Sequence, residues 1–316
     1  MTARIFIDGE VGTTGLQIRA RLAERADIEL VSLGEAERKD AGARAEALNS
    51  VDLAILCLPD DAAREAVSLV ENPDTRIIDA STAHRTAEGW TYGFPEYMAA
   101  QPGAIRASKR VSNPGCYALT SVAMLHPLIA AGLLPAGHAV TLNAVSGYSG
   151  GGKGLIAAFE DTESDDYTEV PFFAYSLNLE HKHLPEITRW SGLQRPPLFV
   201  PSVGRFAQGM IVQAPLQLWD LPGAPAAVDI HAALAVHYSD CRFVTVAGLE
   251  ESEGLARLEP ESLNGTNTLS LHVFANAGRE QALIAGVLDN LGKGASGQAV
   301  QNMNLMLGLD EGTGLV

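Results

Sequence analysis

Short apolar runs alternate with segments of helical spacing through the first third of the chain, and this alternation limits the fold more than any other feature. The expected strands are residues 4–8, 28–33, 52–58 and 76–80, and the expected helices are residues 16–26, 41–49 and 60–70. The run at 52–58 is almost continuously apolar, as in a strand buried on both faces. Such alternation favours a parallel sheet with helices on both sides. We therefore expect an α/β fold that begins with a Rossmann-type, doubly wound domain.

The pattern changes after Asn113, where a long helix is expected to follow Cys116. Further helices are predicted near 179–190 and at 296–307, and further strands at 139–146, 198–203, 209–218, 243–247, 268–275 and 281–288. A hairpin turn is expected at 276–279. This half predicts an α+β domain with a mostly antiparallel sheet and helices on one side. The predicted domains are residues 1–115, completed by a C-terminal helix within 296–316, and residues 116–295.

Three glycines, Gly9, Gly12 and Gly15, occupy the turn between the first strand and the first helix, with Thr13 and Thr14 among them. Glycine lets a backbone approach a pyrophosphate closely, and a helix N-terminus supplies amide donors. The spacing departs from the common G-x-G-x-x-G, so a glycine turn without a ligand remains an alternative. The position of the turn in a βαβ unit favours dinucleotide binding.

The end of the second expected strand bears on the choice of dinucleotide. An NAD enzyme usually places an acid there for the ribose. This chain has Ser32 at that point and Glu35 close by, and Arg38 and Lys39 follow. Cations at this place suit the 2′-phosphate of NADP, although a solvated charged loop would look the same. We therefore predict NADP(H) as the cofactor.

Cys116 lies at a junction between a loop and a helix, directly after Pro114 and Gly115. A helix N-terminus stabilises a thiolate through its dipole and free amides, and the same amides can form an oxyanion hole. A free cysteine is more often buried and inert. Cys57 and Cys241 fit that description, because each lies in or beside an apolar strand. Cys116 is the predicted covalent nucleophile.

His181 and His183 flank Lys182 just before Pro185, which is tolerated in the first turn of a helix. Residues two apart point to different sides of a helix, so one histidine is expected to face a cleft. Histidine is the usual acid or base near neutral pH, and a cysteine paired with it is an activated nucleophile. Surface histidines are the alternative. A zinc site is disfavoured because no third ligand is evident, so no metal is expected.

Two further segments are candidate anion sites. Ser81 and Arg85 follow the strand at 76–80, at the edge of a parallel sheet where ligands bind. Arg85 is suited to grip a carboxylate or phosphate. The glycine-rich segment 146–154 nearly matches a P-loop, but Gly154 replaces the required Ser or Thr. A glycine loop that carries Lys153 still offers an anion cradle.

Composition excludes several other kinds of protein. The formal net charge is −16, which disfavours nucleic acid or an anionic membrane as a partner. Three scattered cysteines suggest neither a disulfide framework nor a zinc site. The N-terminus shows no secretory signal pattern, and the longest apolar run is short for a bilayer. We expect a cytoplasmic protein without a membrane or nucleic-acid partner.

Taken together, these motifs resemble the acyl-phosphate reductases related to aspartate-semialdehyde dehydrogenase. Within that superfamily the chain is similar to the shorter N-acetyl-gamma-glutamyl-phosphate reductases of arginine biosynthesis. The segments that carry the resemblance are 9–15, 79–85, 113–117, 146–153, 181–186 and 290–298. The family's first loop usually has Ser or Ala before Gly-Tyr-Thr-Gly, whereas this chain has Glu10-Val11-Gly12-Thr13-Thr14-Gly15.

The resemblance implies roles for individual residues. Cys116 becomes the nucleophile, and the histidine pair becomes the acid/base, with His183 preferred over His181. The implied substrate ligands are Arg85, Ser81, Asn113, Ser146 and Lys153. The implied cofactor ligands are Gly9, Gly12, Thr13, Thr14, Gly15, Ser32, Arg38, Lys39, Ser149, Gly150, Asn290 and Gly294, the last two near the nicotinamide.

The resemblance also implies a Rossmann domain, a catalytic and oligomerisation domain, and a homo-oligomer, either a dimer or a tetramer. The expected reaction is NADPH-dependent reduction of an acyl phosphate to an aldehyde through a cysteine thioester. Three alternatives stay open. The substrate could instead be an aspartyl phosphate or an aminoadipyl compound, or the chain could be a regulator that senses NADP without catalysis.

Overall fold

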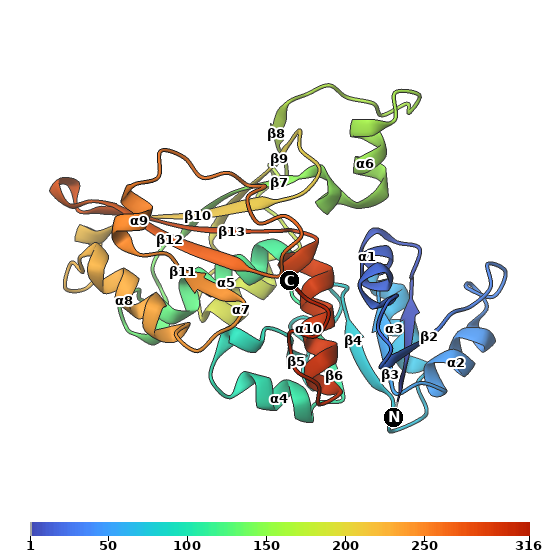
Figure 1. Cartoon of the computed structure of the whole chain (residues 1–316). Coiled ribbons are helices and arrows are strands. Elements are labelled where there is room, and N and C mark those ends of the chain that lie inside the picture. Colours follow the sequence, from blue (N-terminus) through green and yellow to red (C-terminus); the bar gives the residue numbers. More distant parts are fainter. Residues whose placement is uncertain (1) are drawn as a thin grey trace. The chain divides into compact units, whose positions relative to one another are not determined.

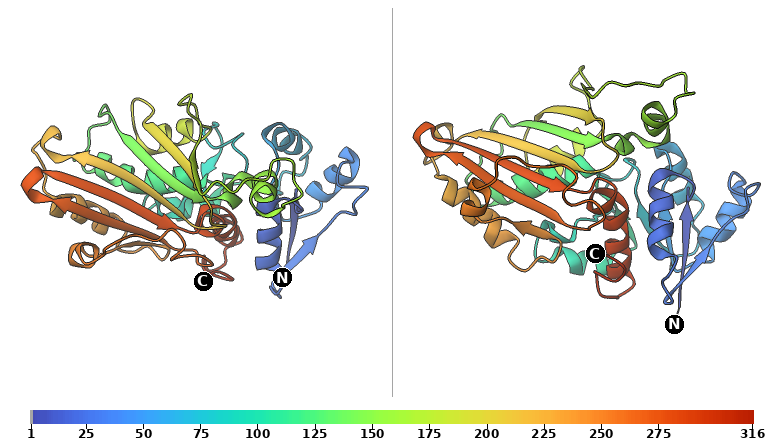
Figure 2. Two further views of the ribbon diagram at one scale, coloured as in Figure 1. Left: turned by 90° about the horizontal axis from the view of Figure 1, so that it is seen from above. Right: turned by 45° about the horizontal axis from the view of Figure 1, so that its top comes forward.

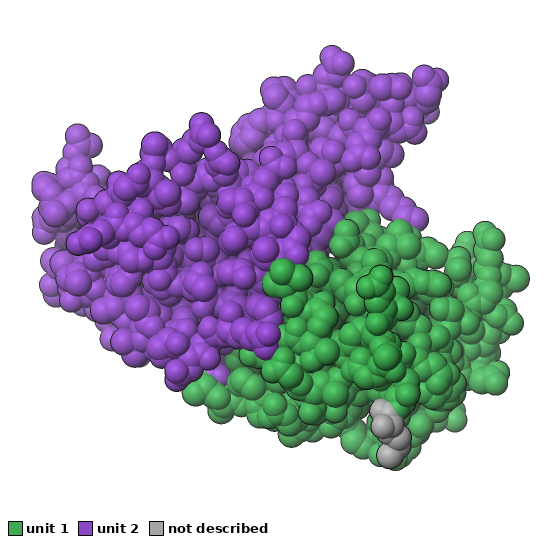
Figure 3. Space-filling view, viewed as in Figure 1, with its two compact units in different colours: residues 1–95, 99–115, 295–316 green, residues 96–98, 116–294 purple. Residues whose placement is uncertain are grey.

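Two sheets, each with its own helices, organise the chain in the computed structural model, which describes residues 2–316 (Figure 1). The structure divides into two compact units (Figure 3). Unit 1 comprises the described chain up to Pro95 together with residues 99–115 and 295–316. Unit 2 comprises residues 96–98 and 116–294.

The sheet of unit 1 has six parallel strands in the order β2-β1-β3-β4-β6-β5. Its strands are β1 (Ala3–Asp8), β2 (Ile28–Val31), β3 (Leu53–Leu56), β4 (Arg76–Asp79), β5 (Thr91–Tyr92) and β6 (Arg110–Ser112). The strand order reverses between β1 and β3, and ligands of such sheets bind at the carboxyl ends beside this point. The expected doubly wound parallel sheet is confirmed.

Helices cover both faces of this sheet because successive strand residues point to opposite sides. The helices are α1 (Thr13–Leu22), α2 (Ala41–Asn49), α3 (Asp60–Ser68), α4 (Gln101–Ala107) and α10 (Gly297–Met306). Ile5 and Ile7 of β1 pack into one core with α1, α4 and α10. Phe6, between them, packs into a second core with α2 and α3.

Helix α1 begins three residues earlier than the sequence suggested. Gly12 is its N-cap, and Gly15, Ile18 and Leu22 form its buried face. Leu16, which the apolar spacing placed in the core, is half exposed. The helix starts at Thr13 because the amide of Leu16 donates to the carbonyl of the extended Gly12 at 2.9 Å, which forms the first helical hydrogen bond.

Unit 2 contains a seven-stranded sheet in the order β11-β12-β13-β10-β7-β9-β8. Its strands are β7 (Thr141–Gly147), β8 (Phe172–Ala174), β9 (Leu198–Gly204), β10 (Met210–Gln217), β11 (Val244–Val246), β12 (Leu269–Asn276) and β13 (Gln281–Leu288). Four strand pairs are antiparallel, and the pairs β7–β9 and β11–β12 are parallel. The predicted mostly antiparallel sheet is therefore confirmed.

A buried helix lies against the centre of this sheet. The helices of unit 2 are α5 (Cys116–Ala130), α6 (Gly152–Glu160), α7 (Leu184–Ser191), α8 (Ala227–His237) and α9 (Leu249–Glu253). Helix α5 packs on β10 and β13, and α7 and α8 pack on α5. Figure 2 shows the long strands side by side with α5 behind them. This packing holds the first turn of α5 in a fixed place.

Candidate active site

Cys116 is the first residue of α5, as the sequence predicted, and its side chain is partly buried. The first turn of α5 contains no acidic residue, so no carboxylate of the helix itself opposes a thiolate there. Gly294 lies against it, because a Cβ added to Gly294 would stand 2.7 Å from the Cβ of Cys116. The absence of a side chain at position 294 leaves room for the thiol.

The two histidines lie together rather than on opposite sides of a helix. Helix α7 begins only at Leu184 and His183 is its N-cap, so the expected helical residues before it are not helical. The rings of His181 and His183 meet edge to face with centroids 4.8 Å apart. His183 is buried and His181 is partly exposed. The prediction that they face different sides is wrong, because the helical geometry on which it depended is absent.

Tyr117 joins the histidines to the cysteine. Its ring centroid lies 6.0 Å from that of His181 and 5.9 Å from that of His183. Burial is the main cause that raises the pKa of Tyr117, and the Cys116 charge adds to it. Both histidines are therefore grouped around the residue that follows the candidate nucleophile.

Tyr175 is a member of this group that the sequence did not indicate. Its hydroxyl lies 3.3 Å from Nε2 of His181, and it is hydrogen-bonded to Tyr117. Burial raises the pKa of Tyr175 to about 12, so it stays protonated near neutral pH. The amide of His183 donates to Nδ1 of His181 at 3.2 Å, which leaves the ring proton of a neutral His181 on Nε2, facing Tyr175. Both ring nitrogens of His181 therefore have protein partners.

Four predicted residues of unit 2 form a second group at the end of β7. The side chain of Asn290 donates to Oγ of Ser149 at 3.1 Å and accepts from the amide of Gly209 at 2.7 Å. A Cβ on Gly150 would stand 3.4 Å from both Nδ2 of Asn290 and Oγ of Ser146. Lys153, by contrast, lies exposed in the first turn of α6.

The glycine turn of unit 1, called the glycine cradle below, packs its backbone too closely to admit side chains at Gly9 and Gly15. Gly9 has a φ of +87°, and a Cβ there would stand 2.3 Å from the carbonyl oxygen of Cys57. A Cβ on Gly15 would stand 2.5 Å from the carbonyl oxygen of Gly9. The turn brings the loop after β1 next to the loop after β3, at the reversal of strand order. A pyrophosphate fits such a turn, because bare backbone and the N-terminus of α1 are available to it.

The neighbouring predicted residues lie around a buried acid that the sequence did not single out. Glu10, within the glycine turn, accepts from Oγ of Ser32 at 3.2 Å and from Nη2 of Arg38 at 3.4 Å. Arg19 of α1 donates to the same carboxylate at 2.6 Å. Lys39 is exposed. Ser32 and Arg38 are thus brought together on one carboxylate.

The segment after β4 is held by Asp79, whose carboxylate is fully buried. Ser81 donates to it through its hydroxyl at 2.8 Å and its amide at 2.9 Å, and Nδ1 of His84 lies 2.6 Å from it. Arg85 donates through Nε to the carbonyl of Asn113 and through Nη2 to that of Ala80, both at 3.2 Å. These hydrogen bonds of Ser81 and Arg85 shape the strand end.

Asn113 is similarly engaged within unit 1. Its Nδ2 donates to the carbonyl of Ala295 and its Oδ1 accepts from Nδ2 of Asn302, both at 3.0 Å. These bonds attach the strand end that precedes Pro114 to the C-terminal helix. They give Asn113 a structural task whether or not it also meets a substrate.

Cys57 and Cys241 are only partly buried, like Cys116, so the expectation that they are buried is wrong. Cys57 still differs chemically from Cys116. Burial is the first cause that raises the pKa of the Cys57 thiol to about 12, and the charges of Asp79 and Asp8 add to it. A thiol of this kind is protonated and unreactive near neutral pH.

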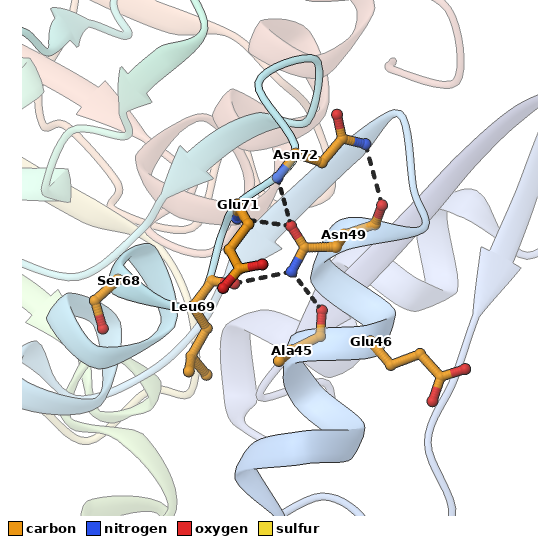
Figure 4. A pocket seen from close by; sticks show the side chains of 7 residues that line it. All are labelled: Ala45, Glu46, Asn49, Ser68, Leu69, Glu71 and Asn72. Carbon is orange, nitrogen blue, oxygen red and sulfur yellow. Dashed lines mark hydrogen bonds between the residues drawn. The ribbon is translucent and has the colours of Figure 1, made fainter.

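A hollow of about 520 Å³ in unit 1 contains none of the predicted site residues (Figure 4). It is lined by Ala45, Glu46, Asn49, Ser68, Leu69, Glu71 and Asn72. The side chain of Asn49 donates to two carbonyls and accepts from the amides of Glu71 and Asn72. These bonds attach the loop after α3 to α2, so the hollow results from the way this loop is held.

Metal-binding clusters and membrane-spanning helices are both absent from residues 2–316. No cluster of three or more His, Cys, Asp or Glu side chains is arranged to hold a metal ion in this part of the chain. Within the same residues, no helix has the length and apolar character needed to cross a membrane.

Comparison with known proteins identifies the family. The family model described as semialdehyde dehydrogenase, NAD binding domain, matches residues 4–104, and the one described as semialdehyde dehydrogenase, dimerisation domain, matches residues 116–290. The N-acetyl-gamma-glutamyl-phosphate reductase of Chelativorans sp. is 57% identical over 97% of this chain and 99% of its own length. That of Trichormus variabilis is 54% identical over 99% of both chains.

Solved structures agree in fold. Aspartate semialdehyde dehydrogenase II from Vibrio cholerae, complexed with ASA, has a TM-score of 0.71 at 13% identity and covers 97% of this chain and 98% of that one. A probable aspartate-semialdehyde dehydrogenase from Pseudomonas aeruginosa has a TM-score of 0.69 at 16% identity, over 97% and 99% of the two chains. On the sequence matches, the chain belongs to the N-acetyl-gamma-glutamyl-phosphate reductase family, within the semialdehyde dehydrogenases.

Proposed function

We propose that this chain reduces N-acetyl-gamma-glutamyl phosphate to N-acetylglutamate 5-semialdehyde and phosphate with NADPH, as a step of arginine biosynthesis. The observation that carries the proposal is the position of Cys116 at the start of α5, next to Tyr117 and the grouped histidines. Relatives of 54–57% identity that bear the reductase name support the choice of substrate.

In this proposal the two units divide the work. Unit 1, closed by its C-terminal helix, binds the dinucleotide, and unit 2 carries the catalytic residues. The glycine cradle supports the first assignment and the surroundings of Cys116 support the second. NADPH is preferred over NADH because Ser32, rather than an acid, directly follows β2, and Arg38 contacts the same carboxylate as Ser32. The proposed cofactor ligands are Gly9, Gly12, Thr13, Thr14, Gly15, Ser32, Arg38, Lys39, Ser149, Gly150, Asn290 and Gly294.

Cys116 acts as the nucleophile. Its thiolate attacks the acyl carbon, the carbon–oxygen bond to phosphate breaks, and a thioester forms as phosphate leaves. Amides at the start of α5 stabilise the oxyanion. Bound NADPH supplies the hydride that reduces the thioester. The carbon–sulfur bond of the resulting thiohemiacetal then breaks, which releases the aldehyde and regenerates the Cys116 thiolate.

His183 is the proposed acid/base. It accepts the Cys116 proton as the sulfur–carbon bond forms and returns a proton as the aldehyde leaves. His181 has both ring nitrogens engaged by protein groups, which supports His183 for this task. In this scheme His183→Asn lowers kcat strongly, whereas His181→Asn has a smaller effect. The reverse order of the two variants would exchange the roles.

Substrate contacts are proposed for Arg85, Ser81, Asn113, Ser146 and Lys153. The bonds of Arg85 to two backbone carbonyls hold its guanidinium at the carboxyl end of β4, where ligands of parallel sheets bind. Lys153 is exposed on α6 and supplies a mobile positive charge for a phosphate. These charges matter because the chain as a whole repels anions.

We further propose that the protein is cytoplasmic and forms a homo-oligomer, a dimer or a tetramer. The match of residues 116–290 to a family model described as a dimerisation domain supports self-association. Light scattering during size-exclusion chromatography measures the mass directly. A mass of one chain, 33.4 kDa, would contradict the oligomer.

The test of the activity compares acyl phosphates in one assay. Purified protein is mixed with NADPH and N-acetyl-gamma-glutamyl phosphate, aspartyl phosphate or an aminoadipyl phosphate, and NADPH absorbance is followed. We expect kcat/KM for the first substrate to exceed the others by at least about 10²-fold. Higher kcat/KM for another substrate would assign a sister reductase. No turnover with NADPH binding intact would favour a regulator.

A further inference from the structure

A buried carboxylate at the glycine turn has no task in the proposed reaction. The side chain of Glu10 is 8% exposed, whereas the side chains of Arg19 and Arg38 that contact it are 48% and 37% exposed. One of its oxygens accepts from Arg19 and Ser32, and the other accepts from Arg38. Burying a charge costs free energy unless the charge is paired, and Glu10 is paired with Arg19 and Arg38. What needs an explanation is why a buried carboxylate stands at this place.

The contacts argue against the usual task of an acid in this part of a dinucleotide site. An acid that reads the adenosine ribose of NAD keeps its oxygens available for the ribose hydroxyls. Both oxygens of Glu10 are already engaged by side chains of α1 and of the segment after β2. Glu10 therefore holds these side chains in place.

We propose that Glu10 is a positioning residue that fixes Arg19, Arg38 and Ser32 around the 2′-phosphate of NADPH, an inference that rests on the proposed NADPH dependence. Without an anchor, two half-exposed arginines would sample many rotamers, and binding would have to order them. Glu10 orders them in advance. Glu10 belongs to the same turn that is proposed to bind the pyrophosphate. Its contacts therefore fix the position of the 2′-phosphate site relative to the pyrophosphate site.

Two features support a phosphate as the ligand of this cluster. Nε of Arg38 is buried and has no hydrogen-bond partner among residues 2–316, so the guanidinium keeps one donor that its contact with Glu10 does not satisfy. Two guanidinium groups against one carboxylate also leave one positive charge at the contacts of Glu10. The exposed Lys39 and the exposed acids Glu35 and Glu37 lie in the same segment. The charge at the contacts of Glu10 is opposite in sign to the charge of the whole chain.

The experiment measures binding of two fragments to the full-length protein by calorimetry. 2′,5′-ADP carries the 2′-phosphate and 5′-AMP lacks it, so their affinity ratio reports this contact without catalysis. We expect Glu10→Gln to weaken 2′,5′-ADP about tenfold and to leave 5′-AMP within about twofold. The matched control is Glu35→Gln, which removes the same charge from an exposed acid near the same strand end and should leave both affinities within about twofold.

A second comparison tests whether Glu10 acts through Arg38. Arg38→Gln should lower 2′,5′-ADP affinity by itself, and adding Glu10→Gln to it should then cause a smaller loss than Glu10→Gln causes in the wild type, because part of the effect of Glu10 passes through Arg38. Fully additive losses would overturn the inference. Unchanged 5′-AMP binding shows that each variant is folded at this site, and Glu10→Asp provides a milder variant.

The remaining outcomes separate this inference from the cofactor proposal. If the wild-type protein binds 2′,5′-ADP no better than 5′-AMP, the NADPH preference is wrong and the task of Glu10 is wrong with it. If the wild type prefers 2′,5′-ADP and Glu10→Gln keeps or improves that preference, only the positioning role is overturned. Tighter 2′,5′-ADP binding in Glu10→Gln would mean that the carboxylate repels the phosphate.

Discussion

At the scale of residues, the surroundings of Cys116 and Cys57 predict opposite reactivity. Cys116 is partly buried at a helix N-terminus, while burial raises the pKa of Cys57 to about 12. We expect iodoacetamide to label Cys116 first at about pH 7.5 and to leave Cys57 unlabelled in the folded protein, as read by peptide mass spectrometry. Cys116→Ser should lower kcat by about 10³-fold or more, because no thioester can form.

The control for this prediction is Cys241→Ser, which changes a cysteine outside the candidate site and should retain wild-type turnover. Near-normal turnover of Cys116→Ser would contradict the covalent mechanism. Rapid labelling of Cys57 would contradict the assignment of its thiol as protonated near neutral pH.

The site residues that the sequence predicted are those with local motifs. Cys116 was identified by Pro114 and Gly115 before it, and the histidine pair by its spacing to Pro185. Glu10 and Tyr175 carried no such signal. The partners of Glu10 lie 9, 22 and 28 residues away, so only the folded sheet brings them together. Glu10 stands between the glycines of the motif, at a position where the motif specifies no residue type. The motif therefore does not indicate that Glu10 holds other side chains in place.

At the scale of elements, α5, α8 and the segment of residues 96–98 meet at a pair of histidines. His126 of α5 stacks on Tyr97 with centroids 4.2 Å apart, and its ring lies 5.8 Å from that of His237. Nε2 of His237 bonds the carbonyls of Glu96 and Tyr97. Burial lowers the pKa of His126 to about 4, with His237 adding to the shift, and burial also lowers the pKa of His237.

The contact between His126 and His237 predicts that acid lowers the stability of unit 2. Both histidines are neutral when folded, whereas an unfolded chain binds protons below the ordinary pKa of 6.5. Their contribution to stability is therefore complete above pH 6.5 and is lost as pH falls toward 4. The loss attributable to His126 is about 1–2 kcal/mol once its partial exposure is taken into account. Thermal unfolding between about pH 7.5 and about pH 4.5 measures it.

A matched pair of variants isolates the contribution of this histidine. His126→Asn should flatten the dependence of the melting temperature on pH, while His138→Asn, outside this contact, should leave the dependence as in the wild type. An equally steep dependence in His126→Asn would show that other groups cause the acid sensitivity.

Prediction of elements from the sequence depended on how clearly each one is bounded. The sequence predicts β1 to β4 of unit 1 and the hairpin of β12 and β13 from their apolar runs, whereas β6, three residues long, is not predicted. Helix α6 was read as a loop, since it opens with Gly152 and Gly154. Helix α8 is apolar nearly all round and shows little periodicity, so its pattern did not mark one face. Strand β5 is two residues long and carries no pattern.

At the scale of the whole molecule, the chain leaves unit 1 and returns to it at the end. Helix α10 supplies Ala299, Val300, Met303, Leu305 and Met306 to the core formed by β1, β3 and α1. Polar bonds add to this closure, because Arg25 donates to Oδ1 of Asn304 at 2.9 Å. The first unit is therefore completed only when the last residues have been made. The stability of the strands next to the glycine cradle depends on residues at the opposite end of the sequence.

That dependence gives the last prediction. Met303 is fully buried in α10, and Met303→Ala should destabilise unit 1 by about 2–5 kcal/mol, through lost burial and the cavity left behind. Because the two units have separate cores, hydrogen exchange should accelerate in β1 and β3 and stay unchanged in β10 and β13. Met98→Ala removes the same atoms from a side chain that is 42% exposed, so it should leave both sheets protected. Faster exchange in β10 and β13 in Met303→Ala would mean that the units unfold as one, in which case the C-terminal helix stabilises the entire chain.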